Sequence, residues 1–135
     1  MNHPRVLIVD DNAINVELVT FVLDAGGFEV ASAADAGRAL ACIEVVAPDL
    51  ILMDIQMPGM DGLELTRRLK ADPSTRHIVV VAFTAYAMKG DEARMRAAGC
   101  DGYLSKPINV ARFAAQVRAC LDEARRVGPG QVGAP

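Results

Sequence analysis

Two short apolar runs that each end in acidic residues constrain this chain more than any other feature. Residues 50–53 run directly into Asp54, and a turn rich in proline and glycine follows. Residues 6–9 run into Asp10 and Asp11. Short apolar runs bounded by turn residues are typical of strands buried on both faces of a parallel sheet. Ligands of open α/β sheets bind at the carboxyl ends of the strands, so we expect a functional edge there.

Apolar runs alternate along the chain with segments of helical periodicity, which predicts an α/β domain of five strand–helix units. Such units form a parallel sheet with helices on both faces and right-handed crossovers. In the doubly wound, flavodoxin-like strand order 2-1-3-4-5, the first and third strands are neighbours, and their aspartates converge. The expected strands are residues 6–10, 28–33, 50–54, 78–83 and 102–105, and the expected helices are residues 12–25, 35–46, 61–71, 88–98 and one capped by Asn109.

The length of 135 residues predicts a single domain. We place it at residues 1–122 and expect residues 123–135, which are rich in glycine and proline, to form a flexible tail or a linker stub. The net charge of −3 and the lack of a basic, aromatic stripe argue against nucleic-acid binding. No apolar run approaches the ~18 residues of a membrane span, and no signal peptide is evident. Three cysteines without metal-ligand spacing favour reduced thiols and a cytoplasmic protein.

The first expected helix has more apolar surface than a core-facing stripe needs. Ile14 and Phe21 lie on a shoulder beside the acidic edge, and Val16 lies on the other shoulder. Isolated exposed apolar residues are common, but their location here also fits a docking surface for a partner helix. The expected core-facing side of this helix comprises Leu18, Val19, Val22 and Leu23. The expected apolar face of the last helix comprises Val110, Phe113, Val117 and Leu121.

Three carboxylates at one strand edge require a cation to balance their charge. An all-oxygen set with few protein ligands suits Mg²⁺, which also takes phosphate oxygens. Asp54 could therefore act as a metal ligand, as a nucleophile toward a phosphoryl group, or as both. Two more strand ends supply groups that suit phosphoryl transfer: Thr84 provides a hydroxyl and Lys106 a positive charge.

These residues and their surrounding motifs together resemble the receiver domains of two-component response regulators. The resemblance covers about residues 5–121, and its motifs taken together are very specific. Segments 11–15 and 85–91 are more narrowly similar to DivK-like single-domain regulators and to the receivers of hybrid histidine kinases. The matching segments are Val9-Asp10-Asp11-Asn12, residues 52–62, Phe83-Thr84-Ala85 and Tyr103-Leu104-Ser105-Lys106-Pro107.

The resemblance implies a role for each matching residue. Asp54 would accept a phosphoryl group from a histidine kinase or a histidine phosphotransfer protein, and the domain would not be an enzyme beyond its own phosphorylation and slow dephosphorylation. Mg²⁺ would be held by Asp10, Asp11, Asp54 and the backbone carbonyl of Gln56. Phosphoryl oxygens would contact Lys106, the Thr84 hydroxyl and the Ala85 amide.

The same resemblance implies a conformational switch. Tyr103 would turn inward when Thr84 moves to the phosphoryl group, and partners would read this change on the fourth helix, fifth strand and fifth helix. Pro107 is a candidate for a cis peptide bond, since only X–Pro bonds adopt cis at modest cost. From the apolar shoulder of the first expected helix, we predict that Ile14, Asn15 and Phe21 dock the donor.

Two further positions and several alternatives remain open in the sequence. Gln56 and Tyr86 lie just beyond Asp54 and Thr84, and the bulk of Tyr86 favours slower hydrolysis of the acyl phosphate. A Mg²⁺-dependent phosphatase with an aspartyl nucleophile is the enzyme alternative, but that chemistry needs an Asp-x-Asp after the first strand, where this chain has Asp10-Asp11-Asn12. A stand-alone regulator is favoured over a receiver excised from a hybrid histidine kinase.

Overall fold

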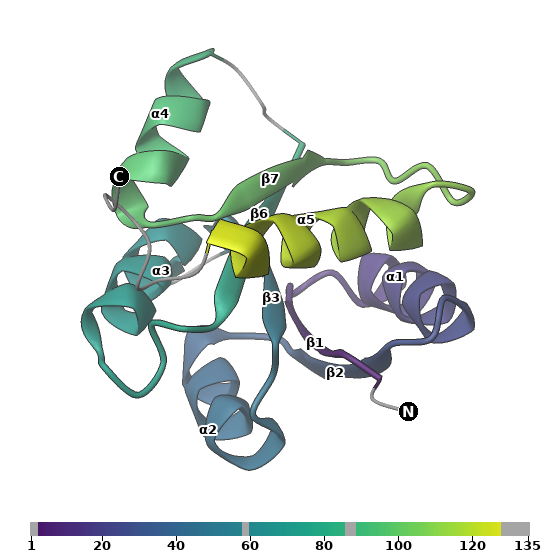
Figure 1. Ribbon diagram of the computed structural model, residues 1–135, viewed down its shortest axis with the longest axis horizontal. Helices are drawn as coiled ribbons and strands as arrows, with labels where there is room; N and C mark the ends of the chain where they lie inside the picture. The colour runs from purple at the N-terminus through teal and green to yellow at the C-terminus, as the bar shows by residue number, and fades with distance from the viewer. Residues whose placement is uncertain (1–2, 58–59, 86–88, 128–135) are drawn as a thin grey trace.

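The computed structural model describes residues 3–57, 60–85 and 89–127 of the chain. Five parallel strands form one sheet, and its order β2-β1-β3-β6-β7 confirms the predicted doubly wound arrangement (Figure 1). A short antiparallel hairpin, β4–β5, follows β3 and was not expected. The strands are β1 (Arg5–Val9), β2 (Glu29–Ala33), β3 (Leu50–Asp54), β4 (Gln56–Met57), β5 (Met60–Asp61), β6 (Val79–Thr84) and β7 (Gly102–Ser105). The helices are α1 (Ala13–Ala25), α2 (Ala36–Val46), α3 (Gly62–Ala71), α4 (Lys89–Ala98) and α5 (Phe113–Val127).

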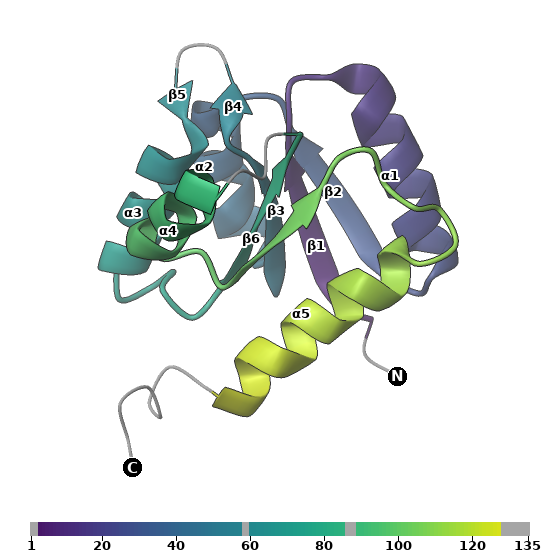
Figure 2. The same cartoon turned by 90° about the horizontal axis from the view of Figure 1, so that it is seen from above.

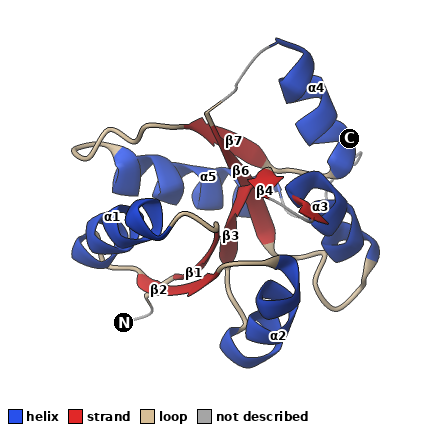
Figure 3. Cartoon of the chain, turned by 180° about the vertical axis from the view of Figure 1, so that it is seen from behind, coloured by secondary structure: helices blue, strands red, loops and turns tan. Residues whose placement is uncertain are grey.

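Helices cover both faces of the sheet, as Figures 2 and 3 show from above and from behind. One core lies between the sheet and α1 with α5, and the other lies between the sheet and α2, α3 and α4. The central strand β3 is buried along its whole length, including its last residue, Asp54. No helix in the described residues is long and apolar enough to cross a membrane.

Local sequence signals explain where the helices begin. The side chain of Asn12 accepts a hydrogen bond from the backbone of Asn15 at 3.0 Å and caps α1. Asp35 caps α2 in the same way through Arg38. Ser, Thr, Asp and Asn favour this position because their oxygens satisfy backbone N–H groups that lack helical partners. The predicted starts at residues 12 and 35 therefore mark the caps rather than the first helical residues.

The last helix departs from the prediction at both ends. Asn109 caps a turn, in which its side chain accepts from the Ala111 amide, and α5 begins only at Phe113. Val110 lies in that turn, outside the helical register, and is 58% exposed, so its predicted place on the buried face was wrong. The helix extends to Val127, so the expected domain boundary at residue 122 falls within α5.

The exposed side of α1 carries more apolar residues than predicted. Leu18, expected in the core, is 42% exposed, while Ile14 and Phe21 are 79% and 72% exposed. These three residues follow i, i+4, i+7 spacing and so share one side of the helix. The core takes a narrower stripe, Val19, Val22 and Leu23. We call Ile14, Leu18 and Phe21 the α1 apolar face.

Candidate functional site

The carboxyl ends of β1 and β3 bring three aspartates together. The two strands are parallel neighbours, with Val9 opposite Met53, so the residues that follow, Asp10 and Asp54, end up side by side. One carboxylate oxygen from each of Asp10, Asp11 and Asp54 lies within 4.8 Å of the others. Asp10 and Asp54 are buried, whereas Asp11 is exposed. The predicted acidic edge is therefore present and open to solvent on the Asp11 side.

Hydrogen bonds fix the Asp10 carboxylate at the start of α1. Its Oδ1 accepts from the backbone N–H of Asn12 at 2.9 Å, and its Oδ2 accepts from the Asn15 side-chain amide at 2.9 Å. Asn15 was predicted to contact a partner, yet its side chain turns toward Asp10. No sequence pattern singled out this contact, although the position of Asn15 in the first turn of a helix that follows Asp10 is compatible with it.

Lys106 lies between two of the carboxylates. Its Nζ is 3.2 Å from Asp10 Oδ2 and 3.5 Å from Asp54 Oδ2. The Lys106–Pro107 peptide bond is cis. The Lys106 ammonium also lies 5.1 Å from the centre of the Phe83 ring, a favourable cation–π contact that sequence reasoning missed. The single positive charge of Lys106 does not balance three carboxylates, so the site retains an excess of negative charge.

Thr84 ends β6 beside this cluster. It is buried, and its neighbour Phe83 lies opposite Asp54 across the β3–β6 pair. The backbone of Lys106 donates to the Thr84 carbonyl at 2.8 Å, which joins the ends of β6 and β7. Ala85 follows Thr84 and is exposed. The ends of four strands thus supply the acids, the hydroxyl and the ammonium group.

The donor set fits Mg²⁺ and argues against softer metals. Three carboxylates with one open side offer hard oxygen ligands and leave room for water or phosphate oxygens, as Mg²⁺ requires. No cysteine or histidine takes part in this cluster, so the thiolate and imidazole ligands typical of zinc sites do not contribute. Gln56 lies in β4, directly after the cluster, where its backbone follows Asp54 and Ile55. Tyr86, predicted to influence hydrolysis, lies outside the described residues.

Tyr103, the predicted switch residue, is on β7 and is exposed. A hydrogen bond between Tyr103 and Glu92 of α4, together with the negative charge of Glu92, raises the pKa of Tyr103 above its usual range. Both effects oppose formation of the phenolate. The contact links α4 to β7.

We expect Glu92→Gln to lower the pKa of Tyr103 toward that of a free tyrosine, because the charge is lost and the hydrogen bond weakens. A pH titration of phenolate absorbance checks this in a Tyr86→Phe background, which leaves Tyr103 as the single tyrosine. Glu44→Gln, at an exposed position of α2, is the matched control. An unchanged pKa in Glu92→Gln would show that the Glu92 carboxylate does not govern the Tyr103 hydroxyl.

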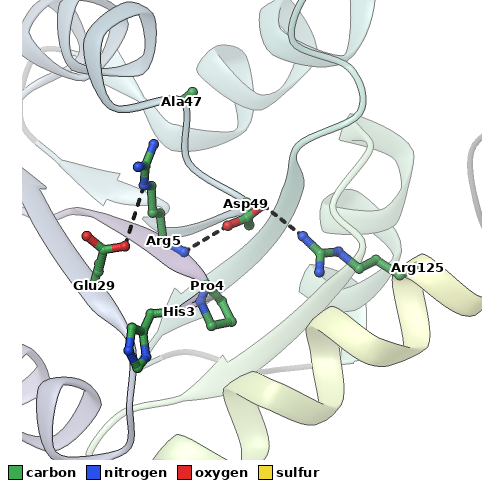
Figure 4. Close-up of a pocket in the computed structure, with 7 residues that line it drawn as sticks. All are labelled: His3, Pro4, Arg5, Glu29, Ala47, Asp49 and Arg125. Carbon is green, nitrogen blue, oxygen red and sulfur yellow. Dashed lines mark hydrogen bonds and ion pairs between the residues drawn. The ribbon is translucent and has the colours of Figure 1, made fainter. Parts of the chain in front are cut away.

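A separate cavity of 390 Å³ lies at the opposite, amino-terminal edge of the sheet (Figure 4). Arg5 pairs with Glu29 at 3.7 Å, and Arg125 of α5 pairs with Asp49 at 2.7 Å. The charged side chains of this cavity thus compensate one another, and they tie the end of α5 to the sheet. The lining residues are His3, Pro4, Arg5, Glu29, Ala47, Asp49 and Arg125.

Comparison with known proteins matches the arrangement to one family. Residues 6–118 match the model of the response regulator receiver domain. This chain belongs to the response-regulator receiver family. The receiver is 47% identical over 119 residues to the polar-differentiation response regulator DivK of Brucella anthropi and to that of Brucella ovis, with 88% of this chain and 97% of each relative covered. The predicted family is thereby confirmed.

Solved structures agree with this assignment. The chemotaxis protein CheY4 of Vibrio cholerae superimposes with a TM-score of 0.83 at 27% identity, covering 88% of this receiver and 99% of that chain. A CheY-like receiver domain protein of Methanospirillum hungatei gives a TM-score of 0.83 at 32% identity, covering 94% and 100%. The receiver is thus a DivK-like signalling domain of two-component systems, with an acidic cluster that could hold a metal ion.

Proposed function

We propose that this receiver accepts a phosphoryl group on Asp54 in a Mg²⁺-dependent phosphorelay. The observation that carries the proposal is the convergence of three carboxylates, Lys106 and Thr84 at one edge of the sheet. A phosphoryl group brings further negative charge, so transfer depends on positioning and charge neutralisation more than on covalent machinery. The family assignment supports a receiver over an aspartyl-nucleophile phosphatase.

In this proposal one Asp54 carboxylate oxygen attacks the phosphorus of a phosphohistidine. The bond between phosphorus and the histidine nitrogen breaks, and an acyl phosphate forms on Asp54. Mg²⁺, when held by Asp10, Asp11, Asp54 and the Gln56 carbonyl, would neutralise carboxylate and phosphoryl oxygens. Lys106 would bind a further phosphoryl oxygen. Its ammonium, which is 3.5 Å from Asp54 Oδ2, would then exchange this contact for one with the phosphoryl group.

The remaining strand-end groups would complete the phosphoryl site and report its occupancy. The Thr84 hydroxyl and the Ala85 amide would donate to phosphoryl oxygens. Movement of Thr84 would open space for Tyr103 to leave Glu92 and turn inward, which biases a two-state element that already exists. Protein partners would then read the surface of α4, β7 and α5.

The partners in this proposal are a histidine kinase or a histidine phosphotransfer protein as donor, and a further protein as the output. The similarity to the polar-differentiation response regulator DivK supports a role as a response regulator. A cytoplasmic location is part of the proposal, and the free state of Cys42, Cys100 and Cys120 supports it, since disulfides are rare in reducing compartments.

Intact mass spectrometry after incubation with acetyl phosphate tests the acceptor chemistry. With Mg²⁺ we expect one phosphoryl adduct, and with EDTA in place of Mg²⁺ we expect none. A protein that gains no adduct in Mg²⁺, and that also fails to bind beryllofluoride as a phosphoryl mimic, would contradict the proposal. Binding of beryllofluoride without an adduct would instead indicate an acyl phosphate that hydrolyses before detection.

The α1 apolar face is the proposed docking surface for the donor. Ile14→Asp and Phe21→Asp place a charge on this face, and we expect each to slow phosphoryl transfer from a phosphorylated histidine donor at least tenfold, the effect of about 1.4 kcal/mol. Intact mass spectrometry of samples quenched at successive times measures the rate at which the acyl phosphate forms. Val45→Asp on α2 is the matched control, because Val45 is 85% exposed on another face.

Phosphorylation by acetyl phosphate should be unchanged in both α1 variants, since a small donor needs no docking surface. Transfer from the protein donor at the wild-type rate in Ile14→Asp and Phe21→Asp would remove the α1 apolar face from the proposal. A similar slowing in Val45→Asp would show that added charge acts without regard to position.

A further inference from the structure

We infer that Asn15 is a positioning residue for the candidate metal site. Its side-chain amide holds the Asp10 carboxylate in place. The inference rests on the proposed function, because it assigns a role to Asn15 within the same site. In the proposal Asn15 does not contact the phosphoryl group. It acts through Asp10, whose carboxylate accepts a hydrogen bond from its side-chain amide.

The contacts of Asp10 carry this inference. Asp10 is 3% exposed, so each of its carboxylate oxygens needs a hydrogen-bond donor or a cation. Oδ1 accepts from the Asn12 amide, and Oδ2 accepts from the Asn15 side chain, both at 2.9 Å. The Asn15 backbone in turn donates to the Asn12 side chain at 3.0 Å, which closes a ring of contacts around the first turn of α1.

Asn15 counteracts a competing interaction at the same oxygen. The Lys106 ammonium is 3.2 Å from Asp10 Oδ2, and a buried carboxylate without another donor there would turn further toward this charge. A closer ion pair between Lys106 and Asp10 would withdraw both groups from the cation and from the phosphoryl group. Asn15 satisfies Oδ2 with a neutral donor, so it orients Asp10 without adding positive charge beside a metal ion.

Residues that hydrogen-bond a metal ligand commonly set metal affinity. Their loss typically lowers that affinity by about 10- to 100-fold, because the ligand loses its preferred orientation. Leucine has nearly the shape of asparagine but no donor. We therefore expect Asn15→Leu to raise the Mg²⁺ dissociation constant by about 10- to 100-fold.

Isothermal titration of wild type and Asn15→Leu with MgCl₂ measures this change directly, without phosphorylation. Thr20→Leu is the matched control, because it places the same side chain at another half-buried polar position of α1. Asn15→Ser is a second variant, too short to reach Asp10 and compatible with a helix start, and it serves if Asn15→Leu does not fold. Circular dichroism establishes that each variant is folded.

A second readout separates positioning from a structural role. In acetyl phosphate reactions, Asn15→Leu should raise the Mg²⁺ concentration at half-maximal rate, while the maximal rate at saturating Mg²⁺ stays within about threefold of wild type. A structural role would lower the maximal rate and the melting temperature and leave the half-saturating concentration unchanged.

The outcomes distinguish the two proposals. If wild type binds Mg²⁺ and the dissociation constants of Asn15→Leu and Asn15→Ser equal that of wild type, the inference is overturned and the proposed function is not. Equal weakening in Thr20→Leu would also overturn it, since any change in α1 would then suffice. Wild type without Mg²⁺ binding would overturn the proposed function, and the inference with it.

Discussion

Asp54→Asn is expected to abolish phosphorylation by acetyl phosphate, so that intact mass spectrometry shows no adduct under conditions that label wild type. The amide lacks the anionic oxygen that would attack phosphorus. It also removes one of the three carboxylates whose oxygens lie within 4.8 Å of one another. The fold should survive, because asparagine has nearly the volume of aspartate. In wild type the carboxylates of Asp10 and Asp11 repel that of Asp54, so loss of the Asp54 charge does not destabilise the fold.

Asp24→Asn is the control for this experiment. Asp24 is exposed on α1, away from the acidic edge, and its substitution should leave the adduct in place. An adduct that persists in Asp54→Asn would show that another side chain accepts the phosphoryl group. Loss of the adduct in both variants would indicate a defect unrelated to the acceptor.

Gly62→Ala is expected to distort β3, the strand that ends in Asp54, without changing any charged group. Gly62 begins α3, and a Cβ atom there would collide with the backbone oxygen of Asp54 and lie 2.8 Å from the Cα atom of Ile55. Backbone cannot move aside as a flexible side chain can, so β3 or α3 must shift. We expect a loss of about 1–3 kcal/mol in the free energy of unfolding, measured by urea denaturation. Slower phosphorylation of Asp54 should accompany it.

Gly37→Ala provides the matched control for the added methyl group. Gly37 lies in α2, and a Cβ atom there would meet only Asp35 Oδ1, at an ordinary 3.5 Å. Alanine in a helix is favoured over glycine, so this variant should gain about 0.5–1 kcal/mol and keep the wild-type phosphorylation rate. A Gly62→Ala protein as stable as wild type would show that α3 and β3 are less closely packed than the structure has them.

Much of the fold followed from local patterns in the sequence. The all-apolar run of β3 and the turn after it predicted a central strand, and the observed bounds, Leu50–Asp54, are the predicted ones. The bounds of β7 are also the predicted ones, whereas those of β1, β2 and β6 differ from the prediction by one residue at one or both ends. Helix starts shifted by one residue at Asn12 and Asp35, since a capping residue is adjacent to the helix rather than part of it.

Predictions that depended on packing between helices were less accurate. Leu18 is on an exposed side of α1 because α1 packs on the sheet beside α5, and the buried stripe is narrower than its apolar periodicity suggested. Val110 is exposed because a turn separates it from α5. Periodicity identifies a helix and its apolar side, but the width of the buried stripe depends on the neighbours that the tertiary structure supplies.

The sequence by itself determined that three acids, a threonine and a lysine end the strands of a doubly wound sheet, because strand order and strand direction bring those ends to one edge. Only the tertiary structure decided how these groups contact one another. The Asn15 amide on Asp10 and the Phe83 ring beside Lys106 are products of side-chain direction and helix placement. Such contacts join elements whose relative positions depend on the whole packed domain, and no local pattern encodes them.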